Sequence, residues 1–270
     1  MLYLGISRHA SFSEGRVTDD AAIFSAVCAL IQDAGYDVVQ IPESVLVTDG
    51  LPADLTIDGI FHMARSEQAL SLIEAYSQQG IPVFNAPKAV RNCLRAGLYG
   101  LLTEAGIPMP QSLVTETGTE TVWNTFPCWV KGQGVRYVQN GPELEQSINA
   151  ECQNAGNGAK VLLQSHVPGI IVKFYGVADT FFSCRQVTDA AQGRFGQEQH
   201  NDLTPASFSR DALRGIALKA AECAGLTIYG GDAIVTPQGQ ILVIDLNDWP
   251  SFRSCREEAA MAISELIMKQ

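Results

Sequence analysis

Two apolar runs near the end of the chain, at 232–236 and 240–246, predict a β-hairpin, because a short Pro-Gln-Gly turn separates them. Asp232 is expected at the outer end of the first strand, within about two residues of Asp245 on the second. Asp245 and Asn247 are two residues apart, so their side chains point to the same face of the strand. The hairpin therefore brings two carboxylates and one amide oxygen together at its open end.

These three residues, which we call the hairpin donors, indicate a site for a hard cation. No His or Cys accompanies them, and carboxylate and amide oxygens suit Mg²⁺ held between a protein and nucleotide phosphates. The alternative is that they are solvated polar side chains at strand ends. We favour the metal site because the apolar strands gather all three at one end of the hairpin.

The composition is that of a globular chain with a substantial core, since 46% of its 270 residues are hydrophobic and 17% are charged. No apolar run reaches the roughly 18 residues that a membrane span needs, and the first residues lack a signal-peptide pattern. The formal net charge of −11 argues against nucleic acid as the main partner, but it allows a small anionic ligand in a local basic pocket. Seven scattered cysteines without a C-x-x-C pair predict free thiols in a reducing cytoplasm.

Residues 1–86 alternate between strand-like and helix-like segments, which predicts a small parallel α/β lobe. Ser66 is expected to cap a helix that ends near Gln79. The turn after the first strand reads Gly-Ile-Ser-Arg-His-Ala, and no Walker A sequence occurs in the chain. The two commonest phosphate-binding loops are therefore excluded.

Two α+β lobes are predicted to follow, at 87–167 and 168–270. A single helix from Pro87 to Glu104 is expected to open the first of them. The polar segment 188–205 in the second is interpreted as a lid or a disordered flap, because it has few apolar residues.

Five motifs stand in a characteristic order along the chain. They are Asn85-Ala86-Pro87, Gly106-Ile107-Pro108-Met109-Pro110, Phe126-Pro127-Cys128-Trp129-Val130-Lys131, Leu163-Gln164-Ser165-His166-Val167-Pro168-Gly169, and Gly231-Asp232-Ala233 with Asp245-Leu246-Asn247. In this order they resemble the ATP-grasp superfamily over nearly the whole chain. The subgroups that it resembles are the ribosomal-protein glutamate ligase-like enzymes and, next, the inositol-phosphate kinases of the same fold. The resemblance implies an N-terminal α/β lobe followed by two α+β lobes with ATP between them.

The resemblance also assigns cations to the nucleotide. Lys131 and Arg95 would contact the phosphates of ATP, and Lys173 would face them from the strand after a hinge. Lys173 and Arg253 are the expected catalytic cations, since charge on a transferred phosphoryl group has to be neutralised.

The hinge would contact adenine through Gln164, Ser165 and His166, mainly by backbone groups. The family often has an acidic residue where Ser165 stands, so this side chain departs from the pattern. The hairpin donors match the family's metal ligands, which implies one or two Mg²⁺ ions, with Mn²⁺ as an alternative.

Arginines in loops after predicted strands indicate an anionic substrate. Arg8 and His9 follow the first strand, Arg65 follows a later one, and Arg253 and Arg256 lie just beyond the hairpin. Guanidinium groups bind carboxylate or phosphate in a bidentate manner. The expected substrates are therefore a small carboxylate, such as an amino acid or peptide, and an amine acceptor.

Three functions agree with these features. The first is an ATP- and Mg²⁺-dependent carboxylate–amine (or carboxylate–thiol) ligase that forms an acyl phosphate. The second is a small-molecule kinase of the inositol-phosphate type, and the third is a non-catalytic nucleotide-binding protein. The inositol kinases have a lysine where Met63 stands and more basic residues elsewhere, so we favour the ligase.

Overall fold

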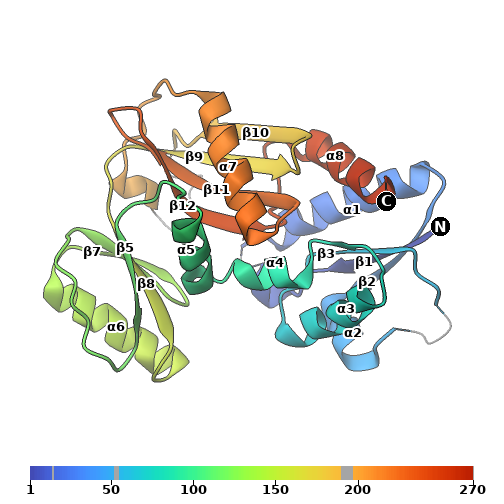
Figure 1. The fold of residues 1–270 in the computed structure, drawn as a ribbon, viewed down its shortest axis with the longest axis horizontal. Coiled ribbons are helices and arrows are strands. Elements are labelled where there is room, and N and C mark those ends of the chain that lie inside the picture. Colours follow the sequence, from blue (N-terminus) through green and yellow to red (C-terminus); the bar gives the residue numbers. More distant parts are fainter. Residues whose placement is uncertain (14, 52–54, 190–196, 270) are drawn as a thin grey trace.

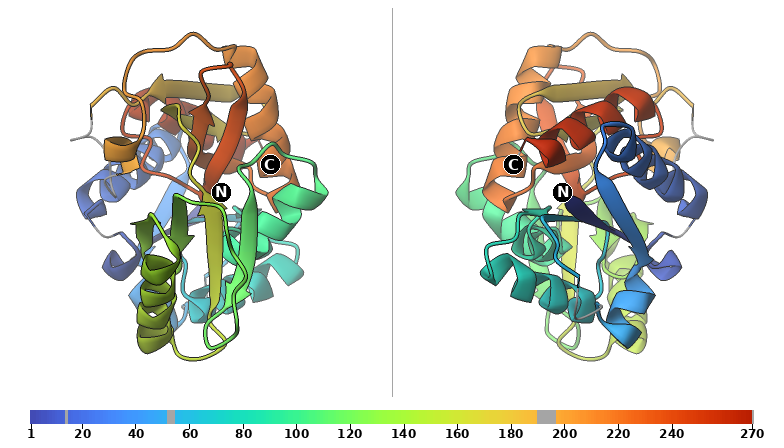
Figure 2. Two further views of the ribbon diagram at one scale, coloured as in Figure 1. Left: turned by 90° about the vertical axis from the view of Figure 1, so that its left-hand side faces the viewer. Right: turned by 90° about the vertical axis from the view of Figure 1, so that its right-hand side faces the viewer.

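The protein is described by a computed structural model for residues 1–13, 15–51, 55–189 and 197–269. Three four-stranded sheets form its framework, and helices cover their outer faces (Figures 1 and 2).

The first sheet is parallel throughout, as predicted, with strand order β2-β1-β3-β4. Its elements are β1 (Leu2–Ser7), α1 (Val17–Asp33), β2 (Asp37–Pro42), α2 (Glu43–Asp49), β3 (Gly59–His62), α3 (Glu67–Gln78) and β4 (Val83–Phe84), with a 3-10 turn η1 (Ala10–Phe12) after β1. Ser66 caps α3 as predicted, because its side chain accepts a hydrogen bond from the N–H of Ala69. Helix α2 was not predicted.

The second sheet is antiparallel, with strand order β5-β8-β6-β7. It consists of β5 (Ser112–Glu116), β6 (Cys128–Lys131), β7 (Val135–Val138) and β8 (Lys160–Ser165), and α6 (Gly141–Ala155) covers one face. Leu144 and Ile148 of α6 pack on Val130 and Leu163 of this sheet. The opposite face is therefore left to the interior of the molecule.

The third sheet contains the predicted hairpin and has strand order β10-β9-β11-β12. Its strands are β9 (Ile170–Val177), β10 (Phe181–Gln186), β11 (Ile228–Val235) and β12 (Ile241–Asp248), with η3 (Gln197–His200) and α7 (Arg210–Ala224) between β10 and β11. The hairpin is longer than predicted, so Asp232 lies in the middle of β11 and not at its outer end. Residues 190–196 of the predicted loop 188–205 lie outside the described residues, and the lid stays a prediction.

The predicted helix Pro87–Glu104 is two helices, α4 (Pro87–Asn92) and α5 (Arg95–Glu104). The chain is extended at Leu94, where ψ is 124°, and this residue is the N-cap of α5. Ala89 and Leu98 belong to the same apolar core as Ala217 of α7, so α4 and α5 pack with the third sheet. The domain boundaries at 86/87 and 167/168 stay a prediction.

The closing helix α8 (Arg256–Met268) packs against α1 of the first lobe, and both views in Figure 2 agree with this contact. Ile263 of α8 is fully buried in one cluster with Val27 and Ile31 of α1. Trp249 and Phe252, from the loop before α8, complete this cluster. The core of the first lobe is therefore finished by the last part of the chain.

In the parts of the chain that the structure describes, no helix is both long and apolar enough to cross a membrane. All seven cysteines are free thiols, as predicted.

Candidate active site

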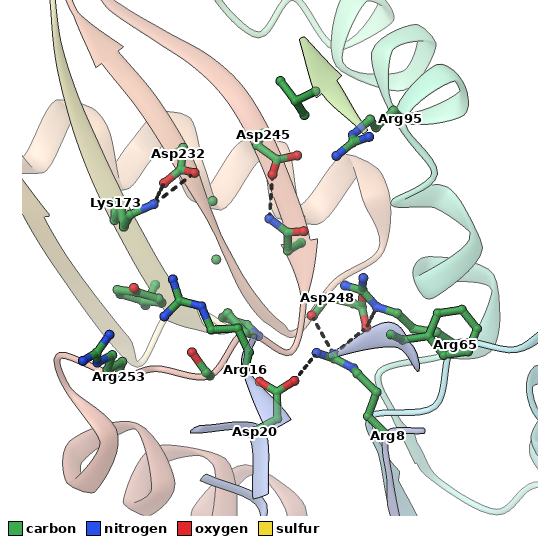
Figure 3. A pocket seen from close by; sticks show the side chains of 18 of the residues that line it. Arg8, Arg16, Asp20, Arg65, Arg95, Lys173, Asp232, Asp245, Asp248 and Arg253 are labelled. Carbon is green, nitrogen blue, oxygen red and sulfur yellow. Dashed lines mark hydrogen bonds and ion pairs between the residues drawn. The ribbon is translucent and has the colours of Figure 1, made fainter. Parts of the chain in front are cut away.

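A cavity of about 640 Å³ lies where the three sheets face one another, and Figure 3 shows its side chains. Eight arginine and lysine side chains line it, against four aspartates. The whole chain, in contrast, has 18 basic and 29 acidic residues. The cavity therefore concentrates positive charge inside an acidic protein, which favours an anionic ligand.

The hairpin donors line this cavity because of a β-bulge. Asp232 is paired with Asp245 across β11 and β12, but Ala233 is paired with Val243, so Ile244 has no partner. Val243 and Leu246 both belong to the core beneath the sheet. In a regular strand, Asp245 would point to the same side as Val243 and would be buried. The extra residue of the bulge shifts the alternation, so Asp245 points into the cavity instead.

The hairpin donors fit a divalent cation by their chemistry. Asn247 lies on the same face as Asp245, as predicted, and its Nδ2 donates to Asp245 Oδ2 at 3.0 Å. Lys173 Nζ lies 3.1 Å from Asp232 Oδ1. Among the described residues no cluster of three His, Cys, Asp or Glu side chains has the arrangement of a metal site. A third protein ligand here would thus be the Asn247 amide, in an all-oxygen set suited to Mg²⁺.

Lys131 joins the second sheet to the bulge. Its Nζ donates to Gln164 Oε1 and to the carbonyl of Ile244, both at 2.8 Å. The bulge leaves Ile244 without a strand partner, so its carbonyl is free for this contact. Burial lowers the pKa of Lys131 to about 8, although the nearby Asp245 carboxylate opposes the shift.

Arg95 holds the turn that follows β6. Its Nη1 donates to the carbonyl of Gly132 at 2.5 Å and to that of Gly134 at 3.3 Å. On the other side of this turn, Glu151 Oε2 accepts from the N–H of Gln133 at 2.8 Å. Arg95 and Gln133 both line the cavity, so the turn is held as part of its wall.

Arg8 lies at the floor of the cavity but is occupied by protein groups. Its Nε donates to the Met63 carbonyl, its Nη1 to Asp20 and its Nη2 to the Trp249 carbonyl, each at 3.0 Å. Only 6% of its side chain is exposed. Arg8 therefore connects the first lobe with the end of β12, where Asp248 also lies within 3.5 Å.

Asp248 is the centre of this connection. Its side chain is 3% exposed, and Oδ1 lies 2.5 Å from Nη2 of Arg65. Burial alone would raise the pKa of the Asp248 carboxyl, but Arg65 and Arg8 outweigh it and hold the pKa below its usual value. Arg8 and Arg65 of the first lobe thus bind Asp248, the residue that directly follows Asn247.

Several solved structures resemble this chain over nearly its whole length. D-alanine–D-alanine ligase from Bacillus anthracis, in its complex with ATP, superposes with a TM-score of 0.72 at 14% identity, over 100% of this chain and 99% of that one. A RimK domain ATP-grasp protein from Sphaerobacter thermophilus gives 0.68 at 18% identity, over 98% and 99%. The ATP-grasp ligase PsnB, complexed with a precursor variant, Mg and ADP, gives 0.65 at 15% identity, over 98% and 97%.

The chain has the ATP-grasp fold. The fold class inferred from the sequence motifs is confirmed. No protein-family model matches the sequence, and no curated protein sequence matches it significantly.

Within the ATP-grasp fold, the predicted hinge lies beside a second, very small cavity. Gln164 and Ser165 line this cavity, and both are buried. The N–H groups of Ser165 and His166 donate to the backbone carbonyls of Gln111 and Pro127. His166 also accepts a hydrogen bond from Trp129 Nε1 at 3.3 Å, and burial lowers its pKa. The adenine contacts assigned to these residues stay a prediction.

The predicted substrate residues separate into two groups. Arg8, Arg65 and Arg253 line the large cavity of the ATP-grasp fold, whereas His9 and Arg256 do not. His9 is exposed and its ring contacts Ser11. Arg256 binds Asp19 of α1 at 2.9 Å, so its guanidinium ties α8 to α1.

Five charged residues at the site were missed from the sequence, and two of them, Asp20 and Arg185, line the cavity. Asp248 and Arg16 line it as well. Glu43, which is 1% exposed, accepts from the N–H groups of His9, Arg65 and Ser66 and so fastens the loops after β1 and β3. For Asp248 the only available signal was position, since it directly follows Asn247.

Proposed function

We propose that this protein is an ATP- and Mg²⁺-dependent ligase that joins a small carboxylate to an amine. The observation that supports this most is the meeting of the hairpin donors with Lys131, Arg95 and Lys173 around one cavity. Two of the solved structures named above are ligases, one in complex with ATP and the other with Mg and ADP.

The cations of the site would hold the phosphates of ATP. Lys131 and Lys173 reach the cavity from facing sheets, and Arg95 lines it from α5. Mg²⁺ held by Asp232, Asp245 and Asn247 would neutralise charge on phosphate oxygens. Fixed cations aimed at the transferred phosphoryl group stabilise the charge that develops there.

The reaction would proceed in two displacements. A carboxylate oxygen of the substrate attacks the γ-phosphorus of ATP, the bond to the bridging oxygen breaks, and ADP leaves. The amine nitrogen then attacks the acyl carbon, the C–O bond to the phosphoryl group breaks, and phosphate leaves. The amine proton passes to solvent, and the product is an amide. Arg253 would contact the carboxylate substrate.

Met63, which stands where the inositol kinases have a lysine, also supports a ligase. Met63 is 1% exposed and belongs to the apolar cluster beneath the first sheet. No cation is supplied from this position, in agreement with a substrate of lower charge than a polyphosphate.

Release of ADP and phosphate from Mg·ATP tests the function, with pooled carboxylates and pooled amines added separately and together. A ligase releases phosphate only when both pools are present. Asp245→Asn should abolish turnover, and Asp33→Asn, which changes an exposed aspartate in the last turn of α1, should not. ADP formed with the phosphoryl group retained on an alcohol would contradict the ligase and favour the kinase. Unchanged turnover in Asp245→Asn would contradict the metal assignment.

A further inference from the structure

Apart from Lys131, Arg95 and Lys173, five arginines line the cavity. Arg8 and Arg65 bind Asp248 and Arg185 lies on β10, which leaves Arg16 and Arg253. Arg16 immediately precedes α1, and Arg253 lies in the loop between β12 and α8. Figure 3 shows both on the opposite side of the view from Arg95. We call Arg16 and Arg253 the arginine pair.

The charge of Arg16 is only weakly compensated. Among the described residues its ion-pair partner is Asp19, at 3.7 Å from Nη1. The same carboxylate is bound more closely by Arg256, at 2.9 Å. Arg256 therefore competes for the acidic partner, and Arg16 keeps binding capacity for an external anion.

Arg253 is held in place by its neighbours in the chain. Phe252 and Trp249 are fully buried and have positive φ angles of 47° and 30°, and Cys255 is 7% exposed. The loop is thus anchored on both sides of Arg253. Within the described parts of the chain, the Arg253 side chain has no hydrogen bond or ion pair.

Hydroxyl groups accompany the arginine pair. Ser251 and Ser254 flank Arg253 in the sequence and line the same cavity, as does Tyr175 of β9. Guanidinium and hydroxyl donors together suit a carboxylate or phosphate oxygen. Asp248, one of the four aspartates of the cavity, is already bound by Arg8 and Arg65. The arginine and hydroxyl groups therefore outnumber the carboxylates that remain to accept from them.

We propose that the arginine pair binds a second anionic group of the carboxylate substrate, at the end remote from the carboxylate that reacts. The substrate is then a dianion, such as a dicarboxylic acid. This inference rests on the proposed function, because it assigns Lys131, Arg95 and Lys173 to the phosphates of ATP. It adds the class of acid that the ligase selects.

Binding of matched probes tests this inference without turnover. The probes are the straight-chain dicarboxylates from malonate to suberate and their monoamides, titrated calorimetrically into protein saturated with Mg²⁺ and a non-hydrolysable ATP analogue. At the best chain length, the dicarboxylate should bind at least about tenfold more tightly than its monoamide, because the amide loses a charge-assisted bidentate contact. Arg16→Gln and Arg253→Gln should each reduce this preference, and the double variant should abolish it.

Arg136→Gln is the matched control, because Arg136 is exposed on β7 and does not line the cavity. It should keep the full preference, and the unfolding midpoints of all variants should be equal. A preference that survives the double variant, or no binding of any dicarboxylate, would overturn the inference. Failure to bind the ATP analogue would instead overturn the proposed function, so the two failures are distinguishable.

Discussion

If Lys131 binds the phosphates of ATP as proposed, nucleotide binding depends on pH. Burial lowers its pKa to about 8, so the side chain is protonated below that pH and neutral above it. Only the protonated form attracts phosphate. The dissociation constant of Mg²⁺ with a non-hydrolysable ATP analogue should therefore be constant near pH 7 and rise about tenfold per unit well above pH 8. Calorimetric titration at a series of pH values measures this.

Lys131→Met separates this lysine from other titrating groups. The variant should bind the analogue weakly at every pH and lose the alkaline dependence, because no charge remains to titrate. An alkaline loss of affinity that persists in Lys131→Met would assign the effect to a different residue.

For single residues, the sequence predicted which side chains belong to the site better than it predicted what surrounds them. The spacing of Asp245 and Asn247 was enough to place both on one face. Lys131 is buried against Ile244, and Asp248 is paired with Arg65. In both cases the partner lies far away in the chain. Local patterns do not contain such contacts, so these properties had to come from the fold.

Among the elements, the close pairing of β11 and β12 depends on Gly231. A Cβ added there would collide with the Asp245 carbonyl and with the Phe174 ring. Gly231→Ala should therefore push apart the strands that hold the hairpin donors, at a cost of roughly 1–3 kcal/mol in the free energy of unfolding. Mg²⁺-dependent nucleotide affinity should fall as well. Urea denaturation and calorimetry measure the two effects.

Gly215→Ala provides the opposite control for a glycine substitution. Gly215 lies in α7 and has open space around its Cβ position. Alanine there should stabilise the protein by about 0.5–1 kcal/mol, because it has the higher helix propensity. Equal behaviour of the two variants would contradict the role given to the strand contact.

The ion pairs of Asp248 with Arg8 and Arg65 connect the first lobe to β12. In Asp248→Asn, Arg8 and Arg65 lose the carboxylate that lies between them in a buried site. We expect a loss of roughly 3 kcal/mol in unfolding free energy, since one partner of a buried ion pair is removed. Urea denaturation beside Asp33→Asn checks this, and a stability equal to that control would contradict the coupling.

Some features of the helices and strands could be predicted from local sequence patterns, and others could not. The hairpin and the parallel first sheet were predicted because alternation and capping are local signals. The bulge at Ile244 and the break between α4 and α5 at Leu94 were not, since neither contains a Gly or Pro that would mark it. The bulge places Val243 and Leu246 in the core and directs Asp245 into the cavity.

On the scale of the whole molecule, α8 is a structural part of the first lobe. Ile263 is fully buried against α1. Ile263→Ala should lower the free energy of unfolding by about 3 kcal/mol, because it leaves a cavity in this shared core. Met261→Ala, on the exposed side of the same helix, should cost much less. Urea denaturation of both variants compares them, and equal losses would contradict the packing of α8 described above.

The distribution of charge also belongs to this scale. A net charge of −11 gave no indication of a basic interior, yet eight of the 18 basic residues line one cavity. These residues are spread from Arg8 to Arg253 and meet only when the three sheets face one another.

The packing of α8 on α1 has a consequence for the order of events during synthesis. The apolar face of α1, with Val27 and Ile31, leaves the ribosome long before the residues that cover it. Domains usually fold in the order in which they are made. Here the core of the first lobe has to wait for α8, so the apolar surface of α1 stays available to chaperones until α8 has been made.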